Sequence, residues 1–114
     1  MMHRPDIQTA IPLRRYQLAD YGVTVLGDIQ SGDTVEYRYI FAMVADGKSE
    51  PDLYVLSISQ PGSQDYLLKL VAPELERELD VSPRWRDLDT FCDQAISLAQ
   101  QALGLMDESP HRLA

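Results

Sequence analysis

The sequence predicts an α+β fold of two layers, in which an antiparallel meander of three to four strands carries one long C-terminal amphipathic helix on one face. Three observations lead to this class. Residues 34–45 (TVEYRYIFAMVA) are rich in β-branched and aromatic side chains, neighbouring segments show the same alternation between short turns, and residues 88–103 repeat apolar side chains every three or four positions. Strands followed by a helix are typical of an α+β sandwich.

Residues 34–45 form the predicted central strand. Side chains of a strand alternate between its two faces. One parity is apolar throughout: Val35, Tyr37, Tyr39, Phe41 and Met43. The other parity turns apolar in its second half: Ile40, Ala42 and Val44. A strand that is apolar on both faces is usually central in its sheet, and we expect the helix to cover the face of Tyr37, Tyr39 and Phe41.

The segments before this strand differ in clarity. Residues 21–29 predict a strand, and the turn formers at residues 30–33 predict an antiparallel connection to residues 34–45. Residues 10–20 fit strand, helix or coil, with a slight preference for an extended segment. Residues 1–9 have no periodicity, and we expect them to be flexible.

Two further strands follow. Residues 53–60 alternate cleanly after an Asp-Gly turn, and residues 65–71 are mostly apolar after the turn at residues 61–64. For residues 73–79 we predict a short helical turn, because Pro73 stands at its first position and Leu75 and Leu79 are four residues apart.

The C-terminal helix is the clearest element. Its apolar stripe is Leu88, Phe91, Cys92, Ala95, Ile96, Ala99, Ala102 and Leu103. Asp87 is a suitable N-terminal cap, and Gly104 is placed to end the helix. Residues 105–114 lose the pattern, so we expect a flexible end.

Composition limits the classes of function. The 114 residues suit one domain (residues 1–114), and the net charge of −8 disfavours binding to nucleic acid or to anionic membranes. The sequence contains no uninterrupted apolar segment long enough to span a membrane. Cys92 is the single cysteine. We therefore expect an acidic, cytoplasmic protein without an internal disulfide.

No constellation for catalysis, cofactor binding or metal binding is visible, and none is predicted. The glycines lack the spacing of a phosphate loop, and His3 and His111 lack partners at zinc-ligand spacing. Cys92 lies on the apolar stripe, so we expect a buried core residue rather than a nucleophile. Arg84-Trp85-Arg86 suits an exposed interaction anchor, although a Trp85 that closes the end of the core is the more ordinary reading.

One helix is too narrow to cover both faces of such a sheet. The opposite face is expected to carry Leu26, Ile40, Ala42, Val44, Leu53 and Val55. Two covers are possible: the N-terminal segment with Ile7, Ile11 and Leu13, or a second copy of the chain. The second copy would form a symmetric dimer, which is the commonest kind of oligomer. We favour the second copy.

These observations predict a small non-enzymatic interaction or assembly protein, a homodimer or the binder of a protein partner. The candidate interaction residues are Leu26, Ile40, Val44, Leu53, Val55, Arg84, Trp85 and Arg86. The alternative is a small-molecule binding protein or a minor enzyme, with a site between sheet and helix lined by some of Tyr37, Tyr39, Tyr54 and Trp85.

Overall fold

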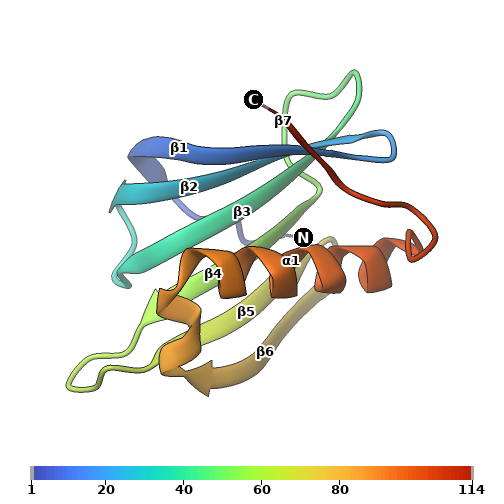
Figure 1. The fold of residues 1–114 in the computed structure, drawn as a ribbon. Helices are drawn as coiled ribbons and strands as arrows, with labels where there is room; N and C mark the ends of the chain where they lie inside the picture. The colour runs from blue at the N-terminus through green and yellow to red at the C-terminus, as the bar shows by residue number, and fades with distance from the viewer. Residues whose placement is uncertain (1, 114) are drawn as a thin grey trace.

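A computed structural model describes residues 2–113 and shows one antiparallel sheet with one long helix on it (Figure 1). The elements follow the chain: β1 (Ile7–Leu18), β2 (Tyr21–Ser31), β3 (Tyr37–Ala45), β4 (Leu53–Ser59), β5 (Tyr66–Ala72), β6 (Leu75–Ser82), the 3₁₀ helix η1 (Pro83–Arg86), α1 (Leu88–Leu103) and β7 (His111–Leu113). The strand order is β6-β5-β4-β3-β2-β1-β7.

The α+β class with one C-terminal helix is confirmed, but the predicted number of three to four strands is wrong, because the sheet has seven. The strands that the sequence did not settle lie at the edges. Residues 10–18 belong to β1, and residues 111–113 add the short β7 to its outer side.

The predicted helical turn at residues 73–79 is also wrong. Pro73 and Glu74 form a tight turn in which Glu74 adopts a φ of 62°, and β6 then pairs antiparallel with β5. So short a segment gains little from helical hydrogen bonds. The exposed edge of β5 offers it a full ladder instead, which is a tertiary contribution that local sequence does not reveal.

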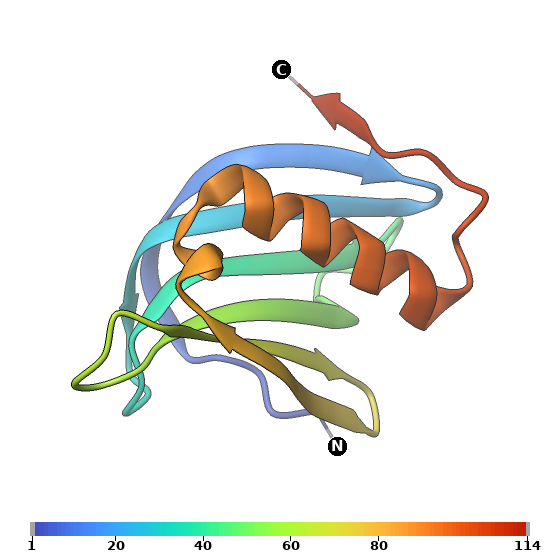
Figure 2. The same cartoon turned by 60° about the horizontal axis from the view of Figure 1, so that its bottom comes forward.

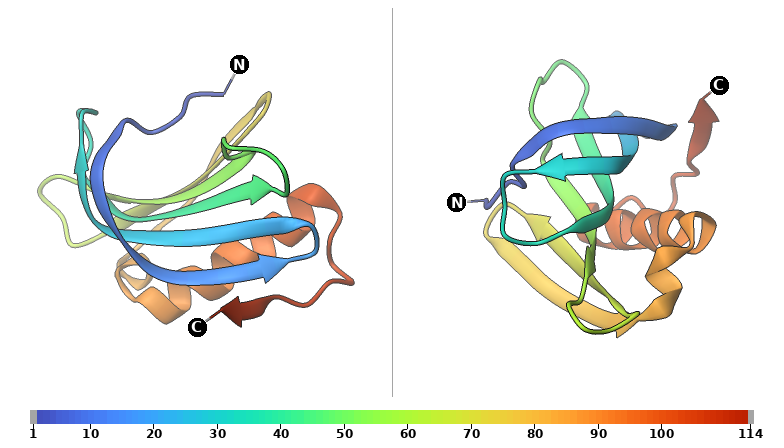
Figure 3. Two further views of the ribbon diagram at one scale, coloured as in Figure 1. Left: turned by 90° about the horizontal axis from the view of Figure 1, so that it is seen from above. Right: turned by 90° about the vertical axis from the view of Figure 1, so that its left-hand side faces the viewer.

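The sheet is strongly bent, and its longest strands cause the bend (Figure 3). The pairing of β1 with β2 is irregular at three places, and Asp28 adopts a φ of 47° at one of them. Such bulges increase the local twist of a strand. At the next irregularity, between Pro12 and Arg14, the Leu13 side chain lies against Gly27. Only glycine leaves room for it, since a Cβ at residue 27 would lie 2.5 Å from a methyl group of Leu13.

Helix α1 lies across one face of the sheet (Figure 2). Asp87 caps its first turn by accepting a hydrogen bond from the Thr90 amide at 2.9 Å, and Gly104 ends it with a φ of 68°, as the sequence predicted. Phe91, Cys92 and Ala95 are fully buried against the sheet. This helix face of the sheet contains the larger of two core clusters.

The second cluster lies on the opposite face, which we call the outer face. Its buried members are Tyr37, Ile40, Ala42, Tyr54, Leu56, Ile58 and Val71. Met2, Ile7, Leu26 and Ile29 pack against it. The cover therefore comes from the N-terminal segment and from the bent ends of β1 and β2, which lie across the sheet from α1 (Figure 3).

Residues 2–6, here called the N-terminal strap, are fixed at three points, one of which is the ion pair of Arg4 with Glu50 at 3.5 Å. The Gly32 amide donates to the Asp6 carbonyl at 2.9 Å, and the Asp6 amide donates to the Asp33 carboxylate at 3.0 Å. Near the other end of the strap, His3 Nδ1 lies 3.0 Å from the Glu76 carboxylate on β6. The strap thus spans from the end of β2 to the far edge of the sheet.

The assignment of side chains to faces differs from the expectation at Tyr37, because β3 is irregular, and at Leu53 and Val55, because of the register between β3 and β4. The register shifts between Tyr37 and Tyr39, so Tyr37 lies on the outer face and Tyr39 on the helix face. Leu53 and Val55 pair with Met43 and Phe41, and all four lie beneath α1.

Flexibility was predicted for residues 1–9 and 105–114. Met1 and Ala114 lie outside the described residues. For the remainder of both ends, flexibility stays a prediction, although residues 7–9 and 111–113 are strand residues.

Candidate functional site

The candidate interaction residues fall into three groups. Ile40, Leu53, Val55 and Trp85 are buried within the single chain. Leu26 and Val44 are half-buried, and Arg84 and Arg86 are exposed. Because they lie on different faces, they do not form one continuous surface.

Trp85 closes the end of the core. Its side chain is 3% exposed, and its indole N–H donates to the Asp80 carboxylate at 3.1 Å. Arg84 lies 4.7 Å above the ring and binds the same carboxylate at 3.2 Å. The buried Ser57 hydroxyl donates to the Trp85 carbonyl at 2.8 Å. The arginines, rather than the indole, are the groups that solvent reaches here.

The aromatic residues expected to line a small-molecule site do not meet. Tyr39 and Trp85 are buried on the helix face, whereas Tyr37 and Tyr54 belong to the cluster on the outer face. The Tyr39 hydroxyl donates to the Arg86 carbonyl at 2.9 Å, and its ring packs against Phe91 at 5.4 Å between centroids. No single site between sheet and helix can therefore contain all four.

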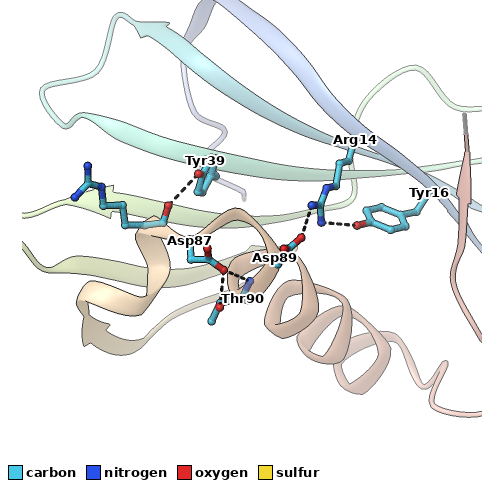
Figure 4. Close-up of polar contacts among 7 residues, drawn as sticks. Arg14, Tyr16, Tyr39, Asp87, Asp89 and Thr90 are labelled. Atoms are coloured by element: carbon cyan, nitrogen blue, oxygen red, sulfur yellow. Dashed lines mark hydrogen bonds and ion pairs between the residues drawn. The ribbon is translucent and has the colours of Figure 1, made fainter.

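Polar contacts fix the start of α1 to the sheet (Figure 4). Arg14 on β1 forms an ion pair with Asp89 and lies 3.5 Å from the Tyr16 hydroxyl. The hydrogen bond that Arg14 donates to the Asp89 carboxylate raises the pKa of Arg14, and burial raises the pKa of the Cys92 thiol beneath. A fully buried, protonated thiol is a core group, in agreement with the expectation for Cys92.

A groove crosses the outer face where the strap leaves the sheet uncovered. One hollow of about 500 Å³ has Val35, Ile58 and Leu67 as apolar walls, with Glu36, Lys69 and Glu78 around it. A second hollow of about 440 Å³ shares Val35, Ile58 and Lys69 and continues to His3 and Glu76. Together these hollows form what we call the outer groove.

Strand β6 borders the outer groove and is an edge strand. Among the described residues it pairs only with β5, so its other side presents backbone groups to solvent. Val81 is 53% exposed beside the half-buried Leu67, which it faces across the strand pair. Unpaired backbone hydrogen-bonding groups of β6 and an apolar hollow therefore lie side by side.

The charges along the β6 edge are mainly acidic. Glu76 and Glu78 share the outer face with Val81, and Lys69 lies opposite Glu78 on β5. The hydrogen bond from His3 holds the pKa of Glu76 below its usual range. Both glutamates are exposed, and carry negative charge at neutral pH.

Sequence reasoning missed this site, although one signal was present. Residues 75–80 (LERELD) alternate apolar or basic with acidic side chains, a pattern that also suits an edge strand with one solvated side. The helical spacing of Leu75 and Leu79 concealed it. The groove itself depends on residues from the segment before β3 and from β4, β5 and β6 that meet only through strand register.

No protein-family model, no curated protein and no solved structure matches the chain. Within residues 2–113, no group of three or more histidine, cysteine, aspartate or glutamate side chains is arranged to hold a metal ion. Helix α1 is the one long helix of this part of the chain, and it is too short and too polar to cross a membrane.

Proposed function

We propose that this chain is a non-enzymatic interaction protein that binds an extended, basic segment of another protein along the β6 edge. The observation that carries the proposal is the adjacency of an unpaired strand edge and the outer groove. Strand addition gains affinity from main-chain hydrogen bonds and specificity from side chains that enter neighbouring pockets.

Charge favours a basic segment. A strand added to β6 places its side chains directly beside Glu76 and Glu78 on the outer face, where opposite charges across a strand pair stabilise the pairing. An apolar residue two positions along would reach Val81 and Leu67. The preferred peptide therefore carries, on the same face of its strand, a lysine or arginine and, two positions further along, a branched apolar residue.

The same charges disfavour a second copy at this edge. Two identical antiparallel strands are related by an axis perpendicular to the sheet, so residues of the same face meet across the pair. Glu76 and Glu78 of one copy would then lie beside those of the other, and like charges directly opposite destabilise a strand pair. Self-association, which the sequence suggested, stays a prediction, and its surface would have to be other than Ile40, Leu53 and Val55.

An NMR titration tests the proposal. The probe is a soluble peptide of alternating lysine and valine, and the control peptide replaces lysine with glutamate. We expect saturable shifts of amides in β6, at Val35 and at Leu67 with the basic peptide only. Double substitution Glu76→Lys/Glu78→Lys should weaken binding several-fold, because each cross-strand charge pair contributes about 0.2–1 kcal/mol. Glu74→Lys, in the exposed turn before β6, is the matched control.

Shifts that map elsewhere, or equal responses to both peptides, would reject strand addition at β6. Sedimentation of the protein alone, over a range of concentrations, separates self-association from binding of the peptide. A species heavier than 12.9 kDa that the basic peptide dissociates would show that this edge pairs with a second copy when no peptide is bound.

A further inference from the structure

The opposite edge of the sheet has a charge of the opposite sign. A hollow of about 440 Å³ lies where β7 ends beside β1, and its walls are Pro12, Leu13, Arg14, Arg15, Arg112 and Leu113. Both hollows of the outer groove include acidic residues, and this one has none. In a chain with a net charge of −8, three arginines around one hollow are a marked local exception.

Strand pairing brings these arginines to the same edge of the sheet. Arg112 lies opposite Tyr16, and Leu113 lies opposite Arg15. Arg15 and Arg112 are exposed, and neither has an ion pair among the described residues. Arg14 is half-buried and is held by Asp89 from α1. The pairing places Arg14 and Arg112 on the helix face and Arg15 on the other face, so the three arginines flank the hollow from both faces of this edge.

The geometry points to a binding site for a small organic anion, one that carries a phosphate or carboxylate group on an apolar body. Guanidinium groups donate two parallel hydrogen bonds to such oxyanions. Leu13 and Leu113, which are 39% and 47% exposed, supply apolar surface in the same hollow. Polyanions such as nucleic acid are a poorer fit, because the acidic remainder of the surface repels a long chain of phosphates.

The test is an NMR titration of the full chain at constant ionic strength with four probes: inorganic phosphate, phenyl phosphate, acetate and benzoate. We expect saturable shifts confined to residues 12–15 and 111–113. Phosphates and carboxylates are separate arms, and the tighter arm identifies the anionic group. Within each arm the aromatic probe should bind more tightly, because about fourfold in affinity accompanies each methylene-sized group that is buried.

Substitutions assign the site. Arg15→Gln and Arg112→Gln should each weaken binding about tenfold or more, since hydrogen bonds to a charged group are the strong ones. Arg77→Gln, an exposed arginine on the far edge of the sheet, should leave it unchanged. Asp89→Asn should tighten binding, because it removes a competing carboxylate and releases Arg14.

Two results would overturn the inference. Shifts that grow linearly, or that persist equally in the Arg15 and Arg112 variants, would show only general screening of charge. Aromatic probes that bind no more tightly than inorganic phosphate or acetate would show that the leucines form no part of a site.

Discussion

Replacing Ile40 by aspartate distinguishes a face that is internal to the chain from a face that joins two copies. If the outer face were a dimer interface, Ile40→Asp should yield a folded monomer. In the structure Ile40 is fully buried beneath the strap and the bent ends of β1 and β2. We therefore expect the substitution to unfold the protein.

The magnitude follows from the burial. Removing most of a buried isoleucine side chain costs about 2–5 kcal/mol. A carboxylate at this position would also lack a partner, and an unpaired buried charge adds several kcal/mol or forces the group to bind a proton. A domain of this size is stable by about 5–15 kcal/mol. The sum removes most or all of that stability at neutral pH.

Far-UV circular dichroism with urea unfolding measures the outcome. Ile40→Val should cost only about 0.5–1.5 kcal/mol and shows that the site tolerates a smaller apolar group. Ile11→Asp, at a β1 position that is 51% exposed, should leave the midpoint nearly unchanged. An Ile40→Asp protein that stays folded with the wild-type midpoint would refute the assignment of this face to the interior.

Three further predictions concern the core and the strap. Phe91→Ala should destabilise the protein by about 3–5 kcal/mol in urea unfolding, because the ring is fully buried, and the exposed Asp93→Ala is the control. The hydrogen bond that Tyr37 donates at 2.6 Å lowers the pKa of the Asp33 carboxyl group. The Asp33 carboxylate therefore stabilises the folded protein at pH values above its usual pKa, and this contribution is lost as the pH falls through the lowered pKa. Urea unfolding at several pH values should therefore show a smaller loss below about pH 4 in Asp33→Asn than in wild type; an equal loss in both would contradict the role of Asp33. Cys92 should react with a thiol reagent only after unfolding, and rapid reaction of the folded protein would show that the helix does not cover it.

Local patterns predicted the middle of this fold well. The alternation in residues 34–45 and 53–60 and the stripe of the last helix identified β3, β4 and α1, and the caps Asp87 and Gly104 lie where expected. These signals are local, because side-chain periodicity and capping depend on neighbours in sequence. The α+β class followed from them.

The faces of the sheet were harder to predict than its strands. The extra residue Arg38 between the paired positions of Tyr37 and Tyr39 changes the parity of β3. A one-residue shift moves every later side chain to the other face. Periodicity gives no sign of such a bulge, which is why Tyr37 was expected beside Tyr39. Leu53 and Val55 were misplaced for a different reason: the loop between β3 and β4 sets the register that pairs them with Met43 and Phe41 on the helix face, and alternation within one strand does not reveal that register.

The size of the covering elements explains why the unpartnered surface lies at β5 and β6. Helix α1 has 16 residues and is about 24 Å long, whereas seven strands spaced about 4.8 Å apart span roughly 29 Å or more. On the outer face, the bent ends of β1 and β2 cover the central strands. The strap continues this cover and reaches β6 where His3 lies 3.0 Å from the Glu76 carboxylate. Beyond that contact, no further element of residues 2–113 covers Leu67 and Val81, and this is where an added strand would complete the layer.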